Sequence, residues 1–187
     1  MAKENIVARS RLFELVELPQ PDGRNFEVAR RAPGVRLIIV DQEHWKVLLT
    51  KEFRREIDGY DWRLPGGKVF DSLEEYEAFR KSGKDIMSVA MAKAKAEATE
   101  EAGIRVDDLS FFKKSTLGAT VEWDLYVFEA STWQVHTAGQ SLEAGETVDA
   151  VEWHDANTLE QMILEGSMQE ERVALILLQW LNHVNWH

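Results

Sequence analysis

The sequence has no cysteine, so disulfide bonds, thiolate zinc sites and a cysteine nucleophile are all excluded. It also lacks an apolar run long enough to span a membrane, and its start, MAKENIVARS, has no apolar signal-peptide core. We therefore expect a cytoplasmic protein that does not bind membranes.

Positive charge is scarce as well. The 22 Lys and Arg residues are outnumbered by 33 Asp and Glu residues, which gives a formal net charge of -11. This balance argues against a nucleic-acid partner, because phosphate backbones are bound by surplus Lys and Arg. A small phosphate-bearing substrate remains compatible if local arginines or bridging cations offset its charge.

The chain has 187 residues, of which 44% are hydrophobic and 29% are charged. These values are typical of a globular protein with its own hydrophobic core. The length favours one domain, with room for a small appendage.

The most informative stretch is 90–104, AMAKAKAEATEEAGI. Glu97, Glu100 and Glu101 recur at helical spacing and share one face. Apolar residues at 87, 90, 91, 94 and 98 form a second stripe, and Gly103 is typical of a left-handed helix end. The pattern predicts a helix that packs on its apolar side and displays acid on the other.

Two interpretations of the acidic face are open at this point. A run of like charges is most often a solvated helix face, here with Lys93 and Glu97 as an ordinary pair one turn apart. Alternatively, the three carboxylates supply oxygen ligands of the kind that a hard divalent cation such as Mg2+ requires.

The rest of the chain alternates predicted strands and helices in an α+β pattern. A hairpin is predicted at the N-terminus, Ser72 and Asp85 are predicted helix N-caps, and 131–146 is predicted to be a long loop. Strands are predicted at 9–18, 25–31, 35–40, 45–50, 62–64, 109–116, 121–130 and 147–153, and helices at 72–81, from 85 to 103, 156–165 and 169–182.

Several of these segments resemble the Nudix hydrolases. The end of the family signature is matched by the residues EATEEAGI at 97–104, and its beginning by LPGGK at 64–68. KEFRR at 51–55 and the turn at 118–122 are similar to segments of ADP-ribose pyrophosphatases, and 148–181 is similar to their closing strand and two helices. Matches in the family's order are more specific than an isolated glutamate pair.

The resemblance implies a Nudix fold, an α/β/α sandwich with a mixed β-sheet, in residues 33–187. Residues 1–32 would form an N-terminal β-strand extension. Relatives of this type are usually homodimers that exchange their N-terminal strands, so a homodimer is expected.

The resemblance also implies site residues. Glu97, Glu100 and Glu101, with the Gly66 carbonyl, would hold Mg2+, or Mn2+ in its place, and these glutamates would be catalytic. Further residues have implied roles. The general base would be Glu143 or Glu146, and the substrate contacts would be Arg54 and Glu122. Phe26 would stack on the nucleobase or belong to the hydrophobic core.

The chain departs from the signature at three points. Ala96 replaces its arginine, with Lys93 as the nearest substitute. Ser88 stands where the first glutamate is expected, and about fifteen extra residues precede the helix. Glu74, Glu75 and Glu77 in this insert are candidates for the role of that glutamate.

Together these features predict Mg-dependent hydrolysis of the diphosphate bond in a nucleoside diphosphate sugar. ADP-ribose, cleaved to AMP and ribose 5-phosphate, is the leading substrate, and GDP-mannose or another nucleotide sugar is the alternative. From a different class, a Nudix-fold sensor would bind a nucleotide sugar without cleaving it. An isomerase or another diphosphate enzyme on the same fold is a third option.

Overall fold

A central sheet of six strands organises the chain in the computed structural model, which describes residues 4–142, 145 and 147–184. Five strands run in the order β12-β5-β4-β10-β8, and β6 pairs with β5. The strands are β4 (Gly34–Asp41), β5 (Lys46–Arg54), β6 (Gly59–Arg63), β8 (Ser110–Ser115), β10 (Leu125–Ala130) and β12 (Val148–Asp155). Only β4 and β10 pair in parallel within this described sheet, so the sheet is mixed.

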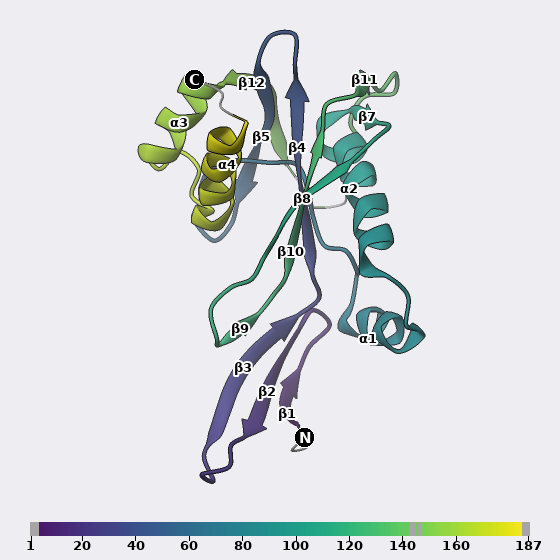
Figure 1. Ribbon diagram of the computed structural model, residues 1–187, viewed down its shortest axis with the longest axis vertical. Helices are drawn as coiled ribbons and strands as arrows, with labels where there is room; N and C mark the ends of the chain where they lie inside the picture. The colour runs from purple at the N-terminus through teal and green to yellow at the C-terminus, as the bar shows by residue number, and fades with distance from the viewer. Residues whose placement is uncertain (1–3, 143–144, 146, 185–187) are drawn as a thin grey trace.

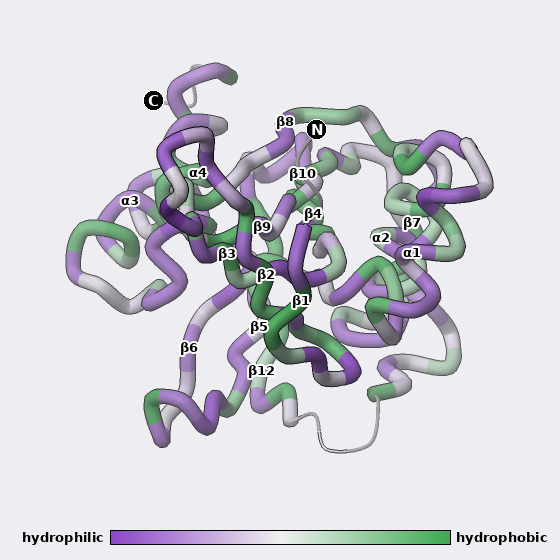
Figure 2. Tube along the Cα trace, turned by 90° about the horizontal axis from the view of Figure 1, so that it is seen from below, coloured by the Kyte–Doolittle hydropathy of each residue, from purple (hydrophilic) through white to green (hydrophobic). Residues whose placement is uncertain are grey.

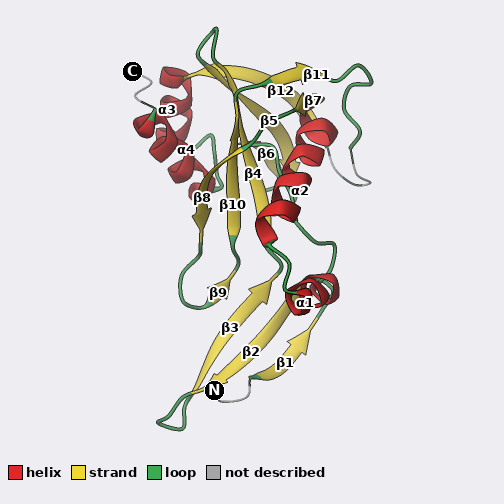
Figure 3. Cartoon of the chain, turned by 45° about the vertical axis from the view of Figure 1, so that its right-hand side comes forward, coloured by secondary structure: helices red, strands yellow, loops and turns green. Residues whose placement is uncertain are grey.

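Helices cover both faces of the sheet. α2 (Ile86–Ala102) lies on one face, and α3 (Ala156–Leu164) and α4 (Glu171–His183) lie on the other (Figures 1 and 3). Figure 2, seen from below, shows α1 (Leu73–Ser82) on the same side as α2. The arrangement is an α/β/α sandwich, as predicted. No described helix is both long and apolar enough to cross a lipid bilayer.

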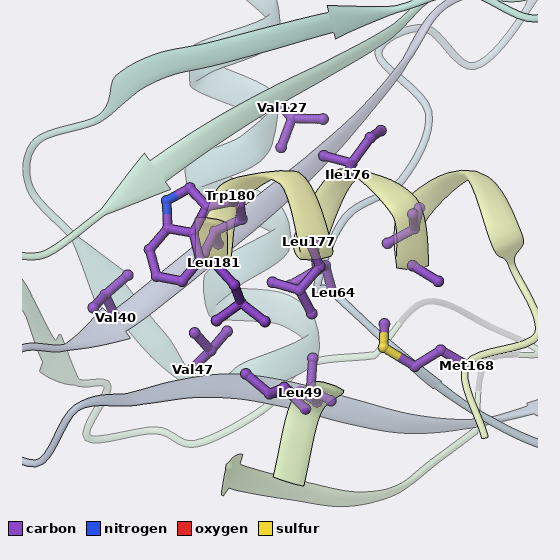
Figure 4. Close-up of a cluster of buried hydrophobic side chains, with 14 of the residues drawn as sticks. Val40, Val47, Leu49, Leu64, Val127, Met168, Ile176, Leu177, Trp180 and Leu181 are labelled. Carbon is purple, nitrogen blue, oxygen red and sulfur yellow. The ribbon is translucent and has the colours of Figure 1, made fainter. Parts of the chain in front are cut away.

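Strand β4 lies at the centre of both hydrophobic cores. It is buried from Gly34 to Val40, because its alternating side chains face two helical layers. Ile38 and Val40 pack on the α3 and α4 side, and Leu37 and Ile39 on the α2 side. Figure 4 shows the first core, where α4 contributes Leu177, Trp180 and Leu181.

On the opposite face, α2 packs through small side chains. Ala90, Ala94 and Ala98 are fully buried. Since helix packing distances depend on the side chains at the contact, alanines allow α2 to lie close to the sheet. The predicted caps are confirmed: the Asp85 side chain accepts the Met87 N–H, and Gly103 adopts a left-handed φ of 63°.

The N-terminal strands form a second sheet, which extends below the central one in Figure 1. The predicted hairpin is confirmed, and a further strand precedes it. Strand β9 pairs in parallel with β3 and so joins the extension to the rest of the chain. The sheet comprises β1 (Asn5–Arg9), β2 (Phe13–Pro19), β3 (Asn25–Arg31) and β9 (Val121–Glu122).

The inserted helix α1 braces this N-terminal sheet. Its predicted cap is confirmed, because the Ser72 hydroxyl accepts the Glu75 N–H. The Leu73 N–H donates to the Arg11 carbonyl at 2.9 Å, and Arg11 Nε donates to the Asp71 carbonyl at 3.0 Å. The insert therefore fixes the turn between β1 and β2.

Two sequence predictions were wrong. The stretch 131–146 is not one long loop, because β11 (Trp133–Val135) pairs with β7 (Ile104–Val106), which follows α2. The predicted strand 121–130 is broken at Trp123 and Asp124 into β9 and β10, which belong to different sheets. Both errors concern pairing between segments that are distant in the sequence, which local patterns do not show.

Core packing predicts a difference between two leucines of α4. Leu177→Ala should lower the free energy of unfolding by about 2–5 kcal/mol, because Leu177 is fully buried and its truncation leaves a cavity. Leu175→Ala is the matched control: this side chain is 55% exposed, and a change within about 0.5 kcal/mol is expected. Urea unfolding followed by circular dichroism measures both. Equal losses would contradict the packing described for α4.

Candidate active site

A cavity of about 490 Å³ opens beside the glycine turn at residues 65–67. Its walls come from the N-terminal extension, β5, β6, α2, the break between β9 and β10, and the residue before α4. Both signs of charge line it. The basic residues are Arg31, Arg36, Arg54, Arg63 and Lys68, and the acidic residues are Glu52, Glu56, Glu97, Glu101 and Glu170.

The glycine turn meets helix α2 in close contact. The Gly66 N–H donates to Glu101 Oε2 at 2.7 Å. A Cβ on Gly67 would lie 2.2 Å from Glu97 Oε1, and one on Gly66 would lie 2.2 Å from the Val35 carbonyl oxygen. Gly66 also adopts a φ of 148°, which side chains rarely tolerate. Both glycines are therefore required for the approach of the two carboxylates.

The carboxylates are not displayed to solvent, which corrects the expectation of an exposed acidic face. Glu97 and Glu101 are each only 5% exposed and lie on the buried side of α2, next to Ala94 and Ala98. Helical spacing placed the glutamates on one face correctly, but it did not show that the glycine turn covers that face. The interpretation as a solvated helix face is therefore wrong for Glu97 and Glu101, although the pair of Lys93 with Glu97 that it included is present.

Burial and crowding change the protonation of Glu101. Removal from water, followed by the charge of Glu52, raises the pKa of Glu101 to about 8, and Glu97 adds to the effect. Arg36 and the Gly66 N–H act in the opposite direction. The side chain of Glu52 accepts the Thr50 hydroxyl at 2.7 Å. The charged form of Glu101 is thus disfavoured by its burial and by the neighbouring carboxylates.

A buried arginine pair supports the other side of the turn. Arg36 Nη1 donates to the Gly66 carbonyl, and its Nη2 lies 3.1 Å from Glu170 Oε2. Arg63 Nη1 lies 3.2 Å from the same Glu170 oxygen. Burial lowers the pKa of Arg36, but the negative charges of Glu170, Glu52 and Glu101 raise it by more, so the pKa is raised overall. Arg36 and Arg63 lower the pKa of Glu170 despite its burial.

Sequence reasoning missed Glu52, Arg36, Arg63 and Glu170. One signal was present for Arg36, because a charged residue inside the apolar run VRLIIV must find a partner when the strand is buried. No comparable sequence pattern indicated Glu170, which contacts Arg36 although the two residues are 134 positions apart in the sequence.

Lys93 occupies the place proposed for a substitute brace. Its Nζ lies 3.0 Å from Glu97 Oε1 and 3.5 Å from Glu100 Oε2. Ala96 cannot make such contacts, so the geometry agrees with Lys93 as the positive partner of Glu97.

Two buried carboxylates of the site suit a divalent cation, but they do not form a complete set of protein ligands. Glu97 and Glu101 are buried carboxylates with unfavourable mutual repulsion, which a cation would relieve. Among the described residues, however, no three acidic or histidine side chains form a ready-made metal site. Mg2+ commonly uses one or two carboxylates and completes its shell with water and substrate phosphates. The two glutamates fit that mode.

Of the other described residues that the sequence analysis assigned to the site, one lines the cavity and three do not. Arg54 lines the cavity, with its Nε 3.0 Å from Glu56 Oε1. Glu100 does not line it and is partly exposed. Glu122 is also outside its lining and binds Arg30 at 2.6 Å, and Phe26 lies outside the lining on β3. Glu143 and Glu146 lie outside the described residues.

The proposed replacements for the first glutamate of the signature are not in the cavity lining. Glu74, Glu75 and Glu77 are on α1, where Glu77 pairs with Arg9. Ser88 lies on the exposed side of α2, and its hydroxyl donates to the Asp85 carbonyl at 2.9 Å. Glu52 is instead the third acid that the structure places next to Glu101.

Comparisons with known proteins add a structural relationship. Neither models of protein families nor curated protein sequences give a match. The chain is similar to a solved structure, the crystal structure of an ADP compounds hydrolase, with a TM-score of 0.68 and 19% identity over 100% of this chain and 95% of that chain. The predicted α+β architecture of the Nudix fold is thereby confirmed.

If Glu97 holds a cation, its contact with Gly67 predicts that Gly67→Ala weakens cation binding. Because the added methyl group displaces the Glu97 carboxylate, Mg2+ affinity measured by calorimetry should fall at least about tenfold. Gly118→Ala is the control, since a Cβ there meets no atom within 4 Å. Unchanged Mg2+ affinity in Gly67→Ala would show that the approach of Glu97 to the turn is not needed.

The raised pKa of Glu101 predicts a pH-dependent effect of Glu101→Gln. The folded pKa of about 8 exceeds the usual 4.5, so metal-free wild type loses stability as pH rises from 4.5 through 8. Thermal unfolding with a chelator should show little advantage of the variant at pH 5 and a clear advantage at pH 9. Added Mg2+ should stabilise wild type more than the variant. A difference independent of pH would contradict this account of Glu101.

Proposed function

We propose that the chain is a Nudix hydrolase that cleaves the diphosphate bond of nucleoside diphosphate sugars in a Mg-dependent reaction. ADP-ribose is the first substrate to test, with AMP and ribose 5-phosphate as products. The main support is the pair of buried carboxylates, Glu97 and Glu101, facing the glycine turn in a cavity that arginines also line. The similarity of fold to an ADP compounds hydrolase agrees with this proposal.

The charges in the cavity suggest a role for each residue in the proposed reaction. Glu97 and Glu101 would hold Mg2+, with the second lone pair of the Gly66 carbonyl as a further donor and Glu100 acting through a bound water. When bound, the cation offsets phosphate charge and acidifies water. Lys93 and the Gly66 N–H hold the two carboxylates in place. Glu143 or Glu146 is proposed as the base, adjoining the cavity residues Gly145 and Thr147 in the sequence.

Substrate binding is assigned first to Arg54. Its guanidinium lines the cavity, and a planar fork of donors suits the oxygens of a diphosphate. Glu122 and Phe26 do not line the cavity of their own chain. Their proposed contacts with ribose and base therefore require the cavity of a second subunit.

A homodimer through the N-terminal sheet would place those residues near a second subunit. The sheet exposes large apolar side chains, which are unfavourable in water unless another surface covers them. These side chains are Ile6, Val7, Phe13, Leu15 and Phe26.

Hydrolysis assays with matched variants test the proposal. Wild type should release AMP from ADP-ribose only with Mg2+ or Mn2+, and Glu97→Gln and Glu101→Gln should each lower kcat by at least about a hundredfold. Glu160→Gln, an exposed position on α3, is the control and should match wild type. A panel with GDP-mannose and other nucleotide sugars determines the preferred substrate by kcat/KM.

Three other results would have distinct meanings. Tight nucleotide-sugar binding without turnover would favour the sensor. Full activity in both Gln variants would overturn the metal assignment. Unchanged rates in both Glu143→Gln and Glu146→Gln would rule out the proposed base.

A further inference from the structure

The side chain of Glu170, the residue before α4, does not cap its own helix. A residue at this position commonly accepts one of the first free N–H groups of the helix. The carboxylate of Glu170 makes no such hydrogen bond. It lines the active-site cavity instead, where its Oε2 lies 3.1 Å from Arg36 Nη2 and 3.2 Å from Arg63 Nη1. The carboxylate at the start of α4 therefore contacts two arginines rather than the helix.

A second buried carboxylate, Asp61 of β6, fixes this contact from the edge of the sheet. Asp61 Oδ2 lies 2.9 Å from Arg63 Nε, and Asp61 Oδ1 accepts the Gln169 N–H at 2.7 Å. Asp61 is only 1% exposed. Because Arg63 and the backbone before α4 are both bound to Asp61, the position of Glu170 is fixed relative to the sheet.

Arg36 extends the contacts of Glu170 to the glycine turn. Arg36 Nη1 donates to the Gly66 carbonyl, and the Gly66 N–H donates to Glu101 Oε2 at 2.7 Å. Gly66 is thus held by Arg36 through its carbonyl and by Glu101 through its N–H. A continuous series of contacts therefore leads from the start of α4, through Arg36 and Gly66, to the carboxylate of Glu101.

Packing alone does not account for a charge at position 36. Arg36 is buried within the apolar strand β4, and its Nε has no hydrogen-bond partner among the described residues. A buried ion pair is often no more stabilising than apolar side chains of similar volume, because both charges must leave water. The stability of the fold would therefore not require the pair of Arg36 with Glu170.

We propose that Arg36 and Glu170 are positioning residues of the metal site, which fix Gly66 and thereby orient the carboxylate of Glu101. Groups that hydrogen-bond to the ligands of a metal orient those ligands, and their loss commonly lowers metal affinity about 10–100-fold. The hydrogen bond from Arg36 also occupies one lone pair of the Gly66 carbonyl and leaves the other available. The proposal rests on the proposed function, in which Glu101 holds the cation.

Binding of Mn2+ in the absence of substrate tests this proposal. Mn2+ is titrated into the full chain, and free Mn2+ is quantified by its electron paramagnetic resonance signal. The double variant Arg36→Met/Glu170→Gln keeps the net charge of wild type, and Arg63 keeps Asp61 as its partner. Its Mn2+ affinity should be at least about tenfold lower. Its urea unfolding should stay close to that of wild type, because both charges of the pair are removed together.

Single variants separate orientation from charge. Arg36→Met removes a positive charge near Glu101, so an effect of charge alone would strengthen Mn2+ binding. Loss of orientation weakens it, and weaker binding is the expected result. Arg36→Lys should recover part of the affinity, because an ammonium group can still donate to the Gly66 carbonyl.

Glu171→Gln is the matched control. Glu171 follows Glu170 directly in the first turn of α4, but its side chain is exposed and does not line the cavity. Its replacement should leave Mn2+ affinity unchanged. Wild-type Mn2+ affinity in the double variant, or stronger binding by Arg36→Met, would overturn the positioning role. If the double variant does not fold, the direction of the Arg36→Met effect decides.

The outcomes distinguish this proposal from the proposed function. If wild type hydrolyses ADP-ribose and the double variant binds Mn2+ as wild type does, the hydrolase stands and the positioning role fails. If Mn2+ binding depends on Arg36 and Glu170 but no nucleotide sugar is cleaved, the positioning role stands and the hydrolase fails. Absence of Mn2+ binding by wild type would overturn both the positioning role and the metal assignment.

Discussion

The contact between α2 and the glycine turn is the constraint on which the site depends. Two carboxylates are buried there only because Gly66 donates an N–H to Glu101 and Gly67 leaves room for Glu97. The same turn is pressed against the Val35 carbonyl of the central strand β4. The closest approaches at any glycine of the chain and the raised pKa of Glu101 therefore occur in one place.

Sequence reasoning succeeded where the determining contacts are local. The helix caps at Ser72, Asp85 and Gly103 were predictable because each depends on residues within one helical turn. The sandwich followed from the order of elements and from the resemblance. Glu97 and Glu101 were identified by spacing and motif, but their burial was not, because it depends on a turn some thirty residues earlier.

The missed site residues show the opposite case. The grouping of Arg36, Arg63 and Glu170 depends on the pairing of both β4 and β6 with β5 and on the position where α4 begins. No spacing rule connects them. Global charge was also a poor guide, because a chain with a net charge of -11 gathers five basic side chains around one cavity. The distribution of charge, which only the fold determines, decides what an acidic protein can bind.

The break between β9 and β10 has a consequence for where the protein can be divided. Sequence reasoning placed a boundary after residue 32, between an extension and a hydrolase domain. Two contacts join the segments on either side of that boundary. Strand β9 pairs with β3, and Trp123, which follows β9, contacts Arg31 at the cavity. A truncated protein starting at residue 33 would keep the carboxylates but lose part of the cavity wall. The unit of sequence resemblance is therefore smaller than the unit that forms the site.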